Sequence, residues 1–245
     1  MKILALDSSG IVASVAIVED DNLLAEYTVN YKKTHSQTLL PMLDEVVKMT
    51  EQDLETVDAI AVAAGPGSFT GLRIGSATAK GLGLALKKPL IEVPTVDALA
   101  YNLYDTKGLI CPIMDARRNQ VYTGIYQFEE HRLVPRKKQW AAAITELLEE
   151  LNELGEYVTF LGDGVPVFRD VIAGTLKVPY SFAPAHVNKQ RAAAVAALGA
   201  VYYKEGKTVS AREHCPEYLR VSQAERERTE KERMEKQKHQ EEQTL

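Results

Sequence analysis

The feature that most constrains this chain is a glycine-rich turn that follows an apolar run and opens a long helical pattern. The turn reads GPGSFTGLRIG at residues 65–75, directly after the run 58–64. A strand, a glycine turn and a helix start also occur in phosphate loops, but the spacing here fits neither common fingerprint. The GxGxxG fingerprint requires glycine at position 70, where this chain has Thr70. The P-loop requires a Lys-Ser or Lys-Thr pair after its last glycine, and this chain has none there. The turn alone therefore does not identify a phosphate site.

The helix that follows, predicted from Thr70 to Lys87, has one edge almost without side chains. Every fourth residue along this edge is small: Gly71, Gly75, Ala79 and Gly83. Each interior glycine costs roughly 1 kcal/mol relative to alanine, so a close contact must offset the lost helix propensity. Two interpretations stay open: this bare ridge meets a partner or ligand, or it packs on the protein's own sheet.

Charge and cysteine content narrow the class of protein. A net charge of −5 argues against a generally basic nucleic-acid coat, so an RNA contact would need a local patch. Cys111 and Cys215 offer neither a disulfide framework nor metal-ligand spacing, which favours a reducing cytosol. The chain reaches Asp7 too early for a signal peptide, and no apolar run is long enough to span a bilayer. We expect a cytoplasmic protein without a membrane partner.

The first half of the chain predicts three strands, then helix, strand, helix, strand and helix. Runs 3–6, 12–18 and 23–29 form an antiparallel meander. An amphipathic helix capped by Ser36 turns these residues inward: Leu39, Leu40, Leu43, Val46 and Val47. The rest of this half consists of strand 59–63, the glycine turn, the long helix, strand 90–93 and a helix capped by Thr95.

The second half repeats this order in shortened form. Asp115, at the end of strand 109–114, corresponds to Asp7 at the end of the first strand. The turn at Gly162 and Gly164 likewise corresponds to the turn at Gly65 and Gly67. Internal duplication is a stronger indication than either glycine turn alone. It predicts an α/β fold of two lobes with the repeated order β-β-β-α-β-α, the second lobe being reduced.

The predicted boundaries divide the chain into three parts. Residues 1–105 form the N-terminal lobe and 106–221 the C-terminal lobe, whose last helix, predicted over 188–204 with Asn188 as its cap, packs back on the first lobe. Residues 222–245 are almost free of apolar side chains and mix Glu with Lys and Arg. Disorder or a lone frayed helix is favoured for this tail, and an RNA-binding arm is the alternative.

Several polar segments are candidates for chemistry. In DSSG at residues 7–10, the acid could hold a hydrated Mg²⁺ ion while the backbone amides that follow it face a phosphate group. The alternative is an ordinary hairpin with common turn residues. Arg117 and Arg118 in a hairpin turn could contact phosphate or a partner carboxylate, although solvated arginines are the favoured interpretation. No two of the five histidines lie three or four residues apart, so no helical metal pair exists, and no GxSxG elbow occurs.

Taken together, these residues resemble the TsaB (YeaZ) family. The resemblance covers nearly all of residues 1–221 and is carried by ILALDSS at 3–9, HSQTLLP at 35–41, the stretch 65–75, MDARR at 114–118 and YLR at 218–220. It implies the two-lobed ASKHA fold shared by actin, sugar kinases and Hsp70. That expectation agrees with the duplication predicted from strand and helix order.

The resemblance also implies a function. The family takes part in making N6-threonylcarbamoyladenosine (t6A) beside the tRNA anticodon. There a paralogue, TsaD, transfers the threonylcarbamoyl group from threonylcarbamoyl-AMP, TsaB is its partner, and the ATPase TsaE joins the pair. TsaD-like enzymes hold a metal through His-x-x-x-His on a helix, whereas here His35 is followed by Leu39. The resemblance therefore implies a non-catalytic scaffold with no catalytic and no metal-binding residue, and contact with tRNA only through the complex.

The same resemblance places the partner surface on the first two helices of the N-terminal lobe. Its expected residues are Ser36, Leu39, Leu40, Leu43, Gly71, Leu72, Gly75, Ala79 and Gly83. Isolated members can pair with themselves through this surface, so a homodimer is expected without the partner. Residues of a vestigial nucleotide site would be Asp7, Ser8, Ser9, Gly65 and Gly67. This chain would require no cofactor of its own, while ATP or ADP and Mg²⁺ would belong to the complex.

Two other functions remain as alternatives. The first is an ATP-binding phosphotransferase or ATPase of the actin-like fold, which would use Asp7 and the two glycine turns. No catalytic base is evident between the predicted lobes, so this hypothesis ranks second. The other is a peptidase, for which the sequence offers no nucleophile and base at a recognised spacing.

Overall fold

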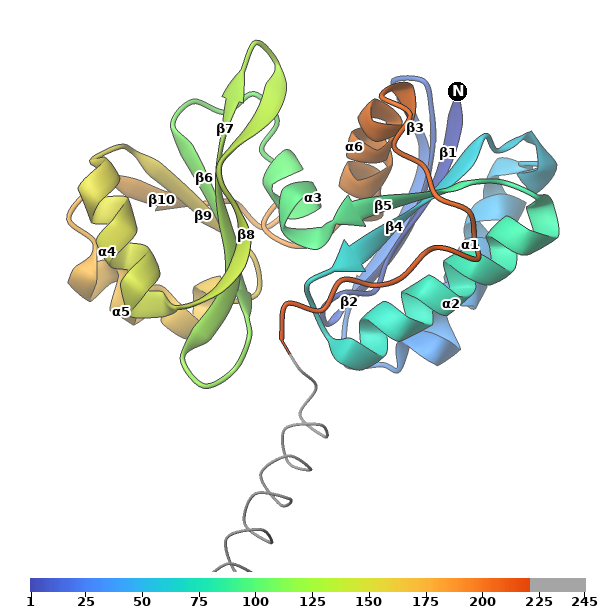
Figure 1. Ribbon diagram of the computed structural model, residues 1–245. Coiled ribbons are helices and arrows are strands. Elements are labelled where there is room, and N and C mark those ends of the chain that lie inside the picture. Colours follow the sequence, from blue (N-terminus) through green and yellow to red (C-terminus); the bar gives the residue numbers. More distant parts are fainter. Residues whose placement is uncertain (221–245) are drawn as a thin grey trace, which may run out of the picture.

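The two halves of the chain form two five-stranded sheets with helices on both faces (Figure 1). This computed structural model describes residues 1–220, so the tail predicted at 222–245 lies outside the described residues. In the first sheet the strand order is β3 (Asn22–Asn30), β2 (Val12–Glu19), β1 (Lys2–Asp7), β4 (Ala59–Gly65) and β5 (Leu90–Pro94). Strands β1 to β3 pair antiparallel and β4 and β5 pair parallel, which confirms the predicted meander.

The second sheet has the same topology. Its order is β8 (Arg132–Ala143), β7 (Gln120–Glu129), β6 (Leu109–Asp115), β9 (Val158–Leu161) and β10 (Tyr180–Phe182). Again the first three strands in sequence pair antiparallel and the last two pair parallel. The duplicated α/β fold predicted from the sequence is therefore confirmed.

Each sheet buries both of its faces because side chains alternate along its strands. In β1, Leu4 and Leu6 pack toward α1 (His35–Thr50) and α2 (Phe69–Leu86), whereas Ile3 and Ala5 pack toward α6 (Ala192–Lys204). In the second sheet, one face packs against α4 (Ile144–Leu154) and α5 (Val165–Thr175) and the other against α3 (Thr95–Tyr101). A short 3-10 helix, Leu54–Thr56, precedes β4.

The third helix of each half lies on the sheet of the other half. Helix α3, which follows the first sheet in sequence, packs on β6 and β7. Helix α6, which follows the second sheet, packs on β1 and β2. This exchange ties the two lobes together at their centre, between the sheets in Figure 1.

Four predicted helix details are wrong. Helix α3 has Pro94 as its N-cap, so Thr95, predicted as the cap, is its first residue. Helix α1 begins at His35 with Thr34 as N-cap, so Ser36 lies inside its first turn. Its buried stripe is Leu39, Met42, Leu43 and Val46, which leaves Leu40 on the flank and 54% exposed. A helix turns by about 100° per residue, so a stripe spaced i, i+3, i+4, i+7 excludes Leu40. Helix α6 begins at Ala192, after Arg191 and not after Asn188.

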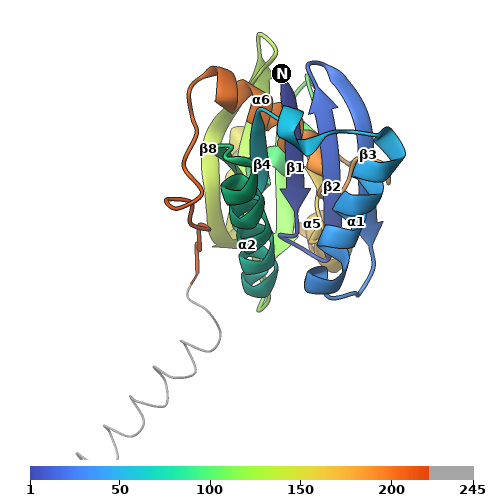
Figure 2. The same ribbon diagram turned by 90° about the vertical axis from the view of Figure 1, so that its right-hand side faces the viewer.

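After α6 the chain returns across the first lobe. Val209 pairs with Leu90 at the edge of β5, and residues 214–220 continue past β4 into the space between the lobes. Figure 2 looks onto α1 and α2 and shows this C-terminal segment running beside α2. None of the helices in residues 1–220 is long and apolar enough to cross a bilayer.

Candidate functional site

The turn after β1 packs directly against the glycine turn that opens α2. The Ser68 amide donates a hydrogen bond of 2.6 Å to the Ser9 carbonyl, and the Ser8 hydroxyl donates one of 2.9 Å to the Gly71 carbonyl. A Cβ atom at Gly67 would lie 2.3 Å from the Ser9 carbonyl oxygen, and one at Gly71 would lie 2.1 Å from that of Ser8. Glycine is therefore required here so that two backbone segments can meet.

The C-terminal segment covers the same turn from another side. The Glu217 amide donates a 2.7 Å hydrogen bond to the Ala64 carbonyl. A Cβ atom at Gly65, whose φ is +121°, would lie 2.2 Å from the Glu217 carbonyl oxygen. The ring of Tyr218 lies 4.6 Å from that of Phe69, in the first turn of α2. The chain's own backbone thus occupies the space over the glycine turn.

Asp7 is a buried carboxylate at the end of β1. Its Oδ1 atom accepts hydrogen bonds from the Ser9 amide at 2.9 Å and from the Ser9 hydroxyl at 2.7 Å. Burial raises the pKa of Asp7 to about 6, against the opposing effects of Ser9 and His35. The five residues predicted as a vestigial nucleotide site therefore lie at the adjacent carboxyl ends of β1 and β4. Whether they bind a nucleotide stays a prediction.

The corresponding turn of the second lobe is also packed on its own strand. A Cβ atom at Gly162 would lie 2.2 Å from the Ile113 carbonyl oxygen, which also accepts a 3.0 Å hydrogen bond from the Gly164 amide. The Asp115 amide donates to the Asp163 carboxylate at 3.3 Å, and burial raises the pKa of Asp163. Both glycine turns serve close backbone contact, which explains their correspondence in the sequence.

The bare ridge of α2 faces the protein's own interior, so its prediction as a partner surface is wrong. The ridge residues and their neighbour Leu72 are buried: Gly71, Leu72, Gly75, Ala79 and Gly83. A Cβ atom at Gly75 would lie 2.5 Å from the Ser8 hydroxyl oxygen, and one at Gly83 would lie 2.9 Å from a methyl group of Leu90. Leu39 and Leu43 of α1 are buried against the same sheet. Small residues are needed here because α2 lies close to the turn after β1 and to β5.

The opposite side of α2 is exposed and also carries small residues. Ala77 and Gly81 lie on it, and a Cβ atom added at Gly81 would meet nothing within 4 Å. Leu84, one turn further on, is 58% exposed, and Leu40 and Met49 of α1 are 54% and 76% exposed. We call Leu40, Ala77, Gly81 and Leu84 the outer face. Sequence reasoning missed Ala77, Gly81 and Leu84 because the stronger small-residue pattern lies on the other side of the helix.

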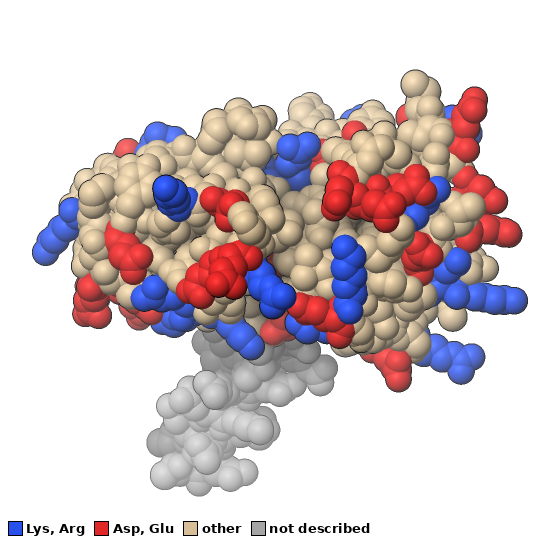
Figure 3. Space-filling view, turned by 90° about the horizontal axis from the view of Figure 1, so that it is seen from above, with Lys and Arg blue, Asp and Glu red and all other residues tan. Residues whose placement is uncertain are grey.

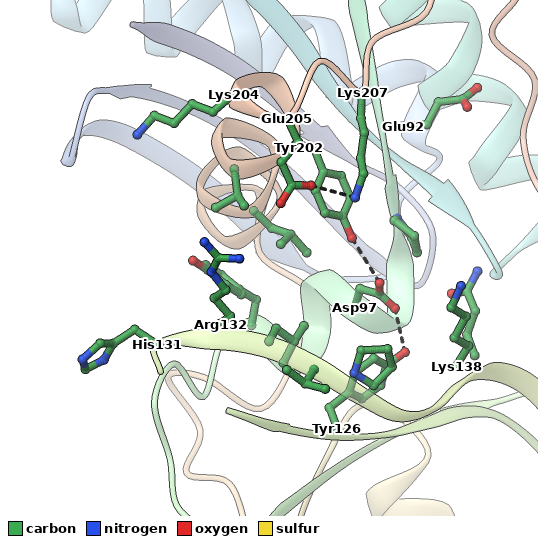
Figure 4. Close-up of a pocket in the computed structure, with 18 of the residues that line it drawn as sticks. Glu92, Asp97, Tyr126, His131, Arg132, Lys138, Tyr202, Lys204, Glu205 and Lys207 are labelled. Atoms are coloured by element: carbon green, nitrogen blue, oxygen red, sulfur yellow. Dashed lines mark hydrogen bonds and ion pairs between the residues drawn. The ribbon is translucent and has the colours of Figure 1, made fainter. Parts of the chain in front are cut away.

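A cavity of about 1060 Å³ lies between the lobes, among α3, α6 and β8 (Figure 4). At its base the Asp97 carboxylate accepts hydrogen bonds from the hydroxyls of Tyr126 at 2.6 Å and Tyr202 at 3.2 Å. Burial raises the pKa of Asp97. The charged residues that line the cavity carry both signs: Glu92, Glu130, Arg132, Lys138, Lys204, Glu205, Lys207 and Glu217. This mixed lining selects no single class of ligand.

Sequence reasoning also missed the cluster at the base of this cavity. Its one signal is that Asp97 is the single charged residue in the short helix TVDALAY. Nothing in the sequence connects this acid with Tyr126 or Tyr202, which follow it by 29 and 105 residues.

The residues at the position of the metal motif of TsaD-like enzymes do not fit a metal. The Nε2 atom of His35 lies 2.8 Å from the Gly10 carbonyl oxygen, and the residue four positions later, Leu39, is a buried apolar side chain. Within residues 1–220 no three His, Cys, Asp or Glu side chains are grouped closely enough to bind a metal ion.

Comparison with known proteins gives consistent matches. A family model described as TsaD, tRNA N6-adenosine threonylcarbamoyltransferase, matches residues 22–228. The chain is 34% identical over 225 residues to the tRNA threonylcarbamoyladenosine biosynthesis protein TsaB of Bacillus subtilis, which covers 92% of this chain and 96% of that protein. It is 31% identical over 224 residues to the TsaB of Escherichia coli, covering 90% and 95% of the two chains.

Solved structures agree on the fold. YeaZ from Pseudomonas aeruginosa superposes with a TM-score of 0.76 over 89% of this chain and 99% of that chain, at 24% identity. A second structure from this organism, described as an uncharacterized protein with similarity to peptidase YeaZ, superposes with a TM-score of 0.75 at 24% identity. At this identity the likeness establishes the two-lobed architecture alone.

Proposed function

The chain belongs to the TsaB (YeaZ) family, and from this premise we propose that it is the non-catalytic partner of a TsaD-like transferase. As a family member it takes part in the biosynthesis of t6A in tRNA. Its proposed task is to bind the transferase that modifies the adenosine N6 beside the anticodon from threonylcarbamoyl-AMP, and to keep that enzyme active. A cytoplasmic location and a TsaE-like ATPase as a third component are part of this proposal.

The observation that carries the non-catalytic role is the occupied glycine turn. In a phosphate-binding turn, the free amides at the start of the helix point at the ligand. Here the Ser68 amide is bound to the Ser9 carbonyl, and the Gly71 amide is bound to the Ser68 side chain at 3.3 Å. The backbone of Glu217 lies on Gly65 as well. A turn used in this way supports a structural role, and we assign any ATP, ADP or Mg²⁺ to the complex and not to this chain.

We propose the outer face of α1 and α2 as the partner surface. Gly81 costs helix propensity of about 1 kcal/mol relative to alanine, and no contact within the described chain offsets this cost. Small residues at Ala77 and Gly81 would let the backbone of a partner helix approach closely, with Leu40 and Leu84 as exposed apolar anchors. Of the residues predicted earlier, only Ser36 and Leu40 are exposed and stay in this proposal. An isolated chain would form a homodimer through the same face.

A matched pair of glycine variants tests this surface. Gly81→Leu places a large side chain on the outer face, and Gly174→Leu places one on α5, where a Cβ atom would also meet nothing within 4 Å. We expect Gly81→Leu to weaken binding of the TsaD-like protein at least tenfold in calorimetric titration, and Gly174→Leu to leave it unchanged. Equal affinities for the two variants would remove α2 from the partner surface.

Reconstitution tests the function itself. Purified TsaD-like protein, TsaE-like ATPase and the enzyme that makes threonylcarbamoyl-AMP are incubated with tRNA, with and without this chain. We expect t6A to form only when the chain is present. Equal modification without it would refute the proposal, whereas tight nucleotide binding and hydrolysis by the chain alone would support an ATPase instead.

A further inference from the structure

We propose that one end of the space between the lobes binds the phosphate backbone and an unpaired base of RNA, an inference that rests on the proposed function. This mouth surface consists of six residues from three parts of the chain: Phe69, Arg73, Arg117, Arg118, Tyr218 and Arg220. In Figure 1 the start of α2, the turn between β6 and β7, and the end of the C-terminal segment meet at the lower end of the two sheets.

A continuous series of contacts joins these residues across both lobes. The guanidinium group of Arg73 lies 4.0 Å from the centre of the Phe69 ring, and that ring stacks on Tyr218 at 4.6 Å. Two residues further on, the Arg220 guanidinium donates a hydrogen bond to the carbonyl of Ala116, which directly precedes Arg117. Two stacked aromatic rings therefore lie between Arg73 on one side and the arginines of the C-terminal segment and the β6–β7 turn on the other, and Tyr218 is the more exposed ring of the two.

The turn between β6 and β7 holds its arginines in an uncommon conformation. Arg117, Arg118 and Asn119 have φ angles of +65°, +56° and +57°, a region that residues with side chains rarely adopt. The turn is held by the Arg117 amide, which donates to the Asp115 carboxylate at 2.8 Å, and by the Ile144 amide, which donates to the Asn119 carbonyl at 3.1 Å. Both arginine side chains are exposed, that of Arg117 by 84%. The fixed turn therefore places the side chains of two consecutive arginines on the surface.

The chemistry of the mouth surface fits a single-stranded or looped nucleic acid. Arginine pairs with phosphate in a bidentate manner and also stacks on bases, while exposed aromatic rings stack with bases of any sequence. Carboxylates also lie near this surface: Asp115 pairs with Arg117 at 3.2 Å, and Glu217 accepts a hydrogen bond from Gln139 at 2.7 Å. The pair with Asp115 offsets the charge of Arg117, so Arg73, Arg118 and Arg220 supply most of the positive charge. By contrast, the face in Figure 3 mixes Lys and Arg with Asp and Glu. In a chain of net charge −5, a cluster of arginines beside two stacked aromatic rings is the kind of local patch that RNA binding requires.

The position of the patch also suits a tRNA held by a neighbouring enzyme. Arg73 and Phe69 lie in the first turns of α2, and Ala77, Gly81 and Leu84 of the outer face follow on the same helix. A partner bound to the outer face would thus lie beside the mouth surface. RNA held in the partner's active site could extend onto it without leaving the complex.

The test uses the complex of the full chain with the TsaD-like protein and an unmodified tRNA transcript. The variant Arg117→Glu/Arg118→Glu is compared with Lys107→Glu/Lys177→Glu, which changes the net charge equally at two exposed positions elsewhere on the second lobe. We expect the arginine variant to bind tRNA about tenfold more weakly at 0.1 M salt, with a slope of log affinity against log salt reduced by about 2. The lysine variant should match the wild type. Tyr218→Ser should weaken binding severalfold without changing the slope, because stacking releases no counterions.

Partner binding without RNA is measured in parallel for every variant. If the arginine variant binds tRNA as the lysine variant does, with the same salt slope, the inference is overturned. If it loses the TsaD-like protein instead, the mouth surface contacts protein and the inference is again overturned. If the wild-type chain fails to bind the TsaD-like protein, the proposed function fails, and the same titration with the chain alone still decides whether the mouth surface binds RNA.

Discussion

The phenolic oxygen of Tyr126 lies 2.6 Å from a carboxylate oxygen of Asp97, and this hydrogen bond joins the two halves of the molecule. Tyr126 belongs to β7 of the second sheet, and Asp97 belongs to α3, which follows the first sheet in sequence. The other carboxylate oxygen accepts a hydrogen bond from Tyr202 of α6 at 3.2 Å. One partly buried acid therefore connects the two exchanged helices with the second sheet (Figure 4).

Tyr126→Phe should lower the free energy of unfolding by about 1.5–3 kcal/mol at pH 7, because it removes a hydrogen bond to a partly buried carboxylate. Urea denaturation followed by circular dichroism measures this change. Tyr104→Phe is the control, since the Tyr104 side chain is 53% exposed and should lose almost nothing. A Tyr126→Phe protein as stable as this control would show that the link contributes little to stability.

Asp7 should make the protein less stable as the pH rises. Its pKa is about 6 in the fold and 3.8 in its ordinary range, so the folded state binds the proton more tightly. The stabilisation by the proton is complete below pH 3.8 and is lost as the pH rises through 6. The difference between the two pKa values corresponds to about 3 kcal/mol of unfolding free energy. Asp7→Asn, which keeps an acceptor for Ser9, should be more stable than the wild type at pH 7.

The pH dependence itself distinguishes Asp7 from the other acids whose pKa is raised by burial. Asp97 and Asp163 also have raised pKa values, but the wild type and the Asp7→Asn variant both contain them, so their contributions cancel in the difference. The difference in unfolding free energy between wild type and Asp7→Asn, measured from pH 4 to pH 7.5, therefore reports Asp7 alone. We expect this difference to change by about 2.5 kcal/mol across this interval, since part of the full effect lies below pH 4. A constant difference would mean that Asp7 is not protonated in the fold near pH 5.

Two glycines of α2 should respond oppositely to alanine. Gly71→Ala places a Cβ atom 2.1 Å from the Ser8 carbonyl oxygen, so the turn must shift, at an expected cost of about 1–3 kcal/mol. Gly81→Ala meets no other atom and should raise the free energy of unfolding by up to about 1 kcal/mol through helix propensity. Denaturant unfolding of both variants measures the change in the free energy of unfolding. Equal effects of the same sign would contradict the inward orientation of the ridge.

The two cysteines should differ in reactivity. Cys111 is buried within β6, where burial raises the pKa of its thiol to about 12, whereas Cys215 is exposed. In native protein at pH 8 we expect a thiol reagent such as dithionitrobenzoate to modify one thiol per chain rapidly, and the second only after unfolding. Cys215→Ser should abolish the rapid reaction. Rapid modification of two thiols in native protein would show that the second sheet opens readily.

Local pattern was sufficient to predict the repeated architecture. Strand alternation, the acids at the ends of the first strand in each half and the two glycine turns depend on neighbours in sequence. The antiparallel meander of the first half and the repeated order of strands and helices therefore followed from the chain alone, whereas the order of the strands within each sheet came from the structure. The resemblance to the TsaB family likewise rests on short segments, and the relatives confirm it. Helix caps were less certain, because several adjacent residues can cap a helix and packing selects among them.

The amino-acid sequence by itself determined that α2 has one edge without side chains, since helical periodicity requires it. Only the tertiary structure decided what that edge contacts, because its neighbours are Ser8 and Leu90, brought there by sheet pairing. The tertiary structure likewise decided that the backbone of Glu217 lies against Gly65, and that Tyr126 and Tyr202 both donate hydrogen bonds to Asp97. Contacts between residues far apart in sequence leave no local periodicity, so the interior use of the glycines and the cluster between the lobes could be found only in the folded chain.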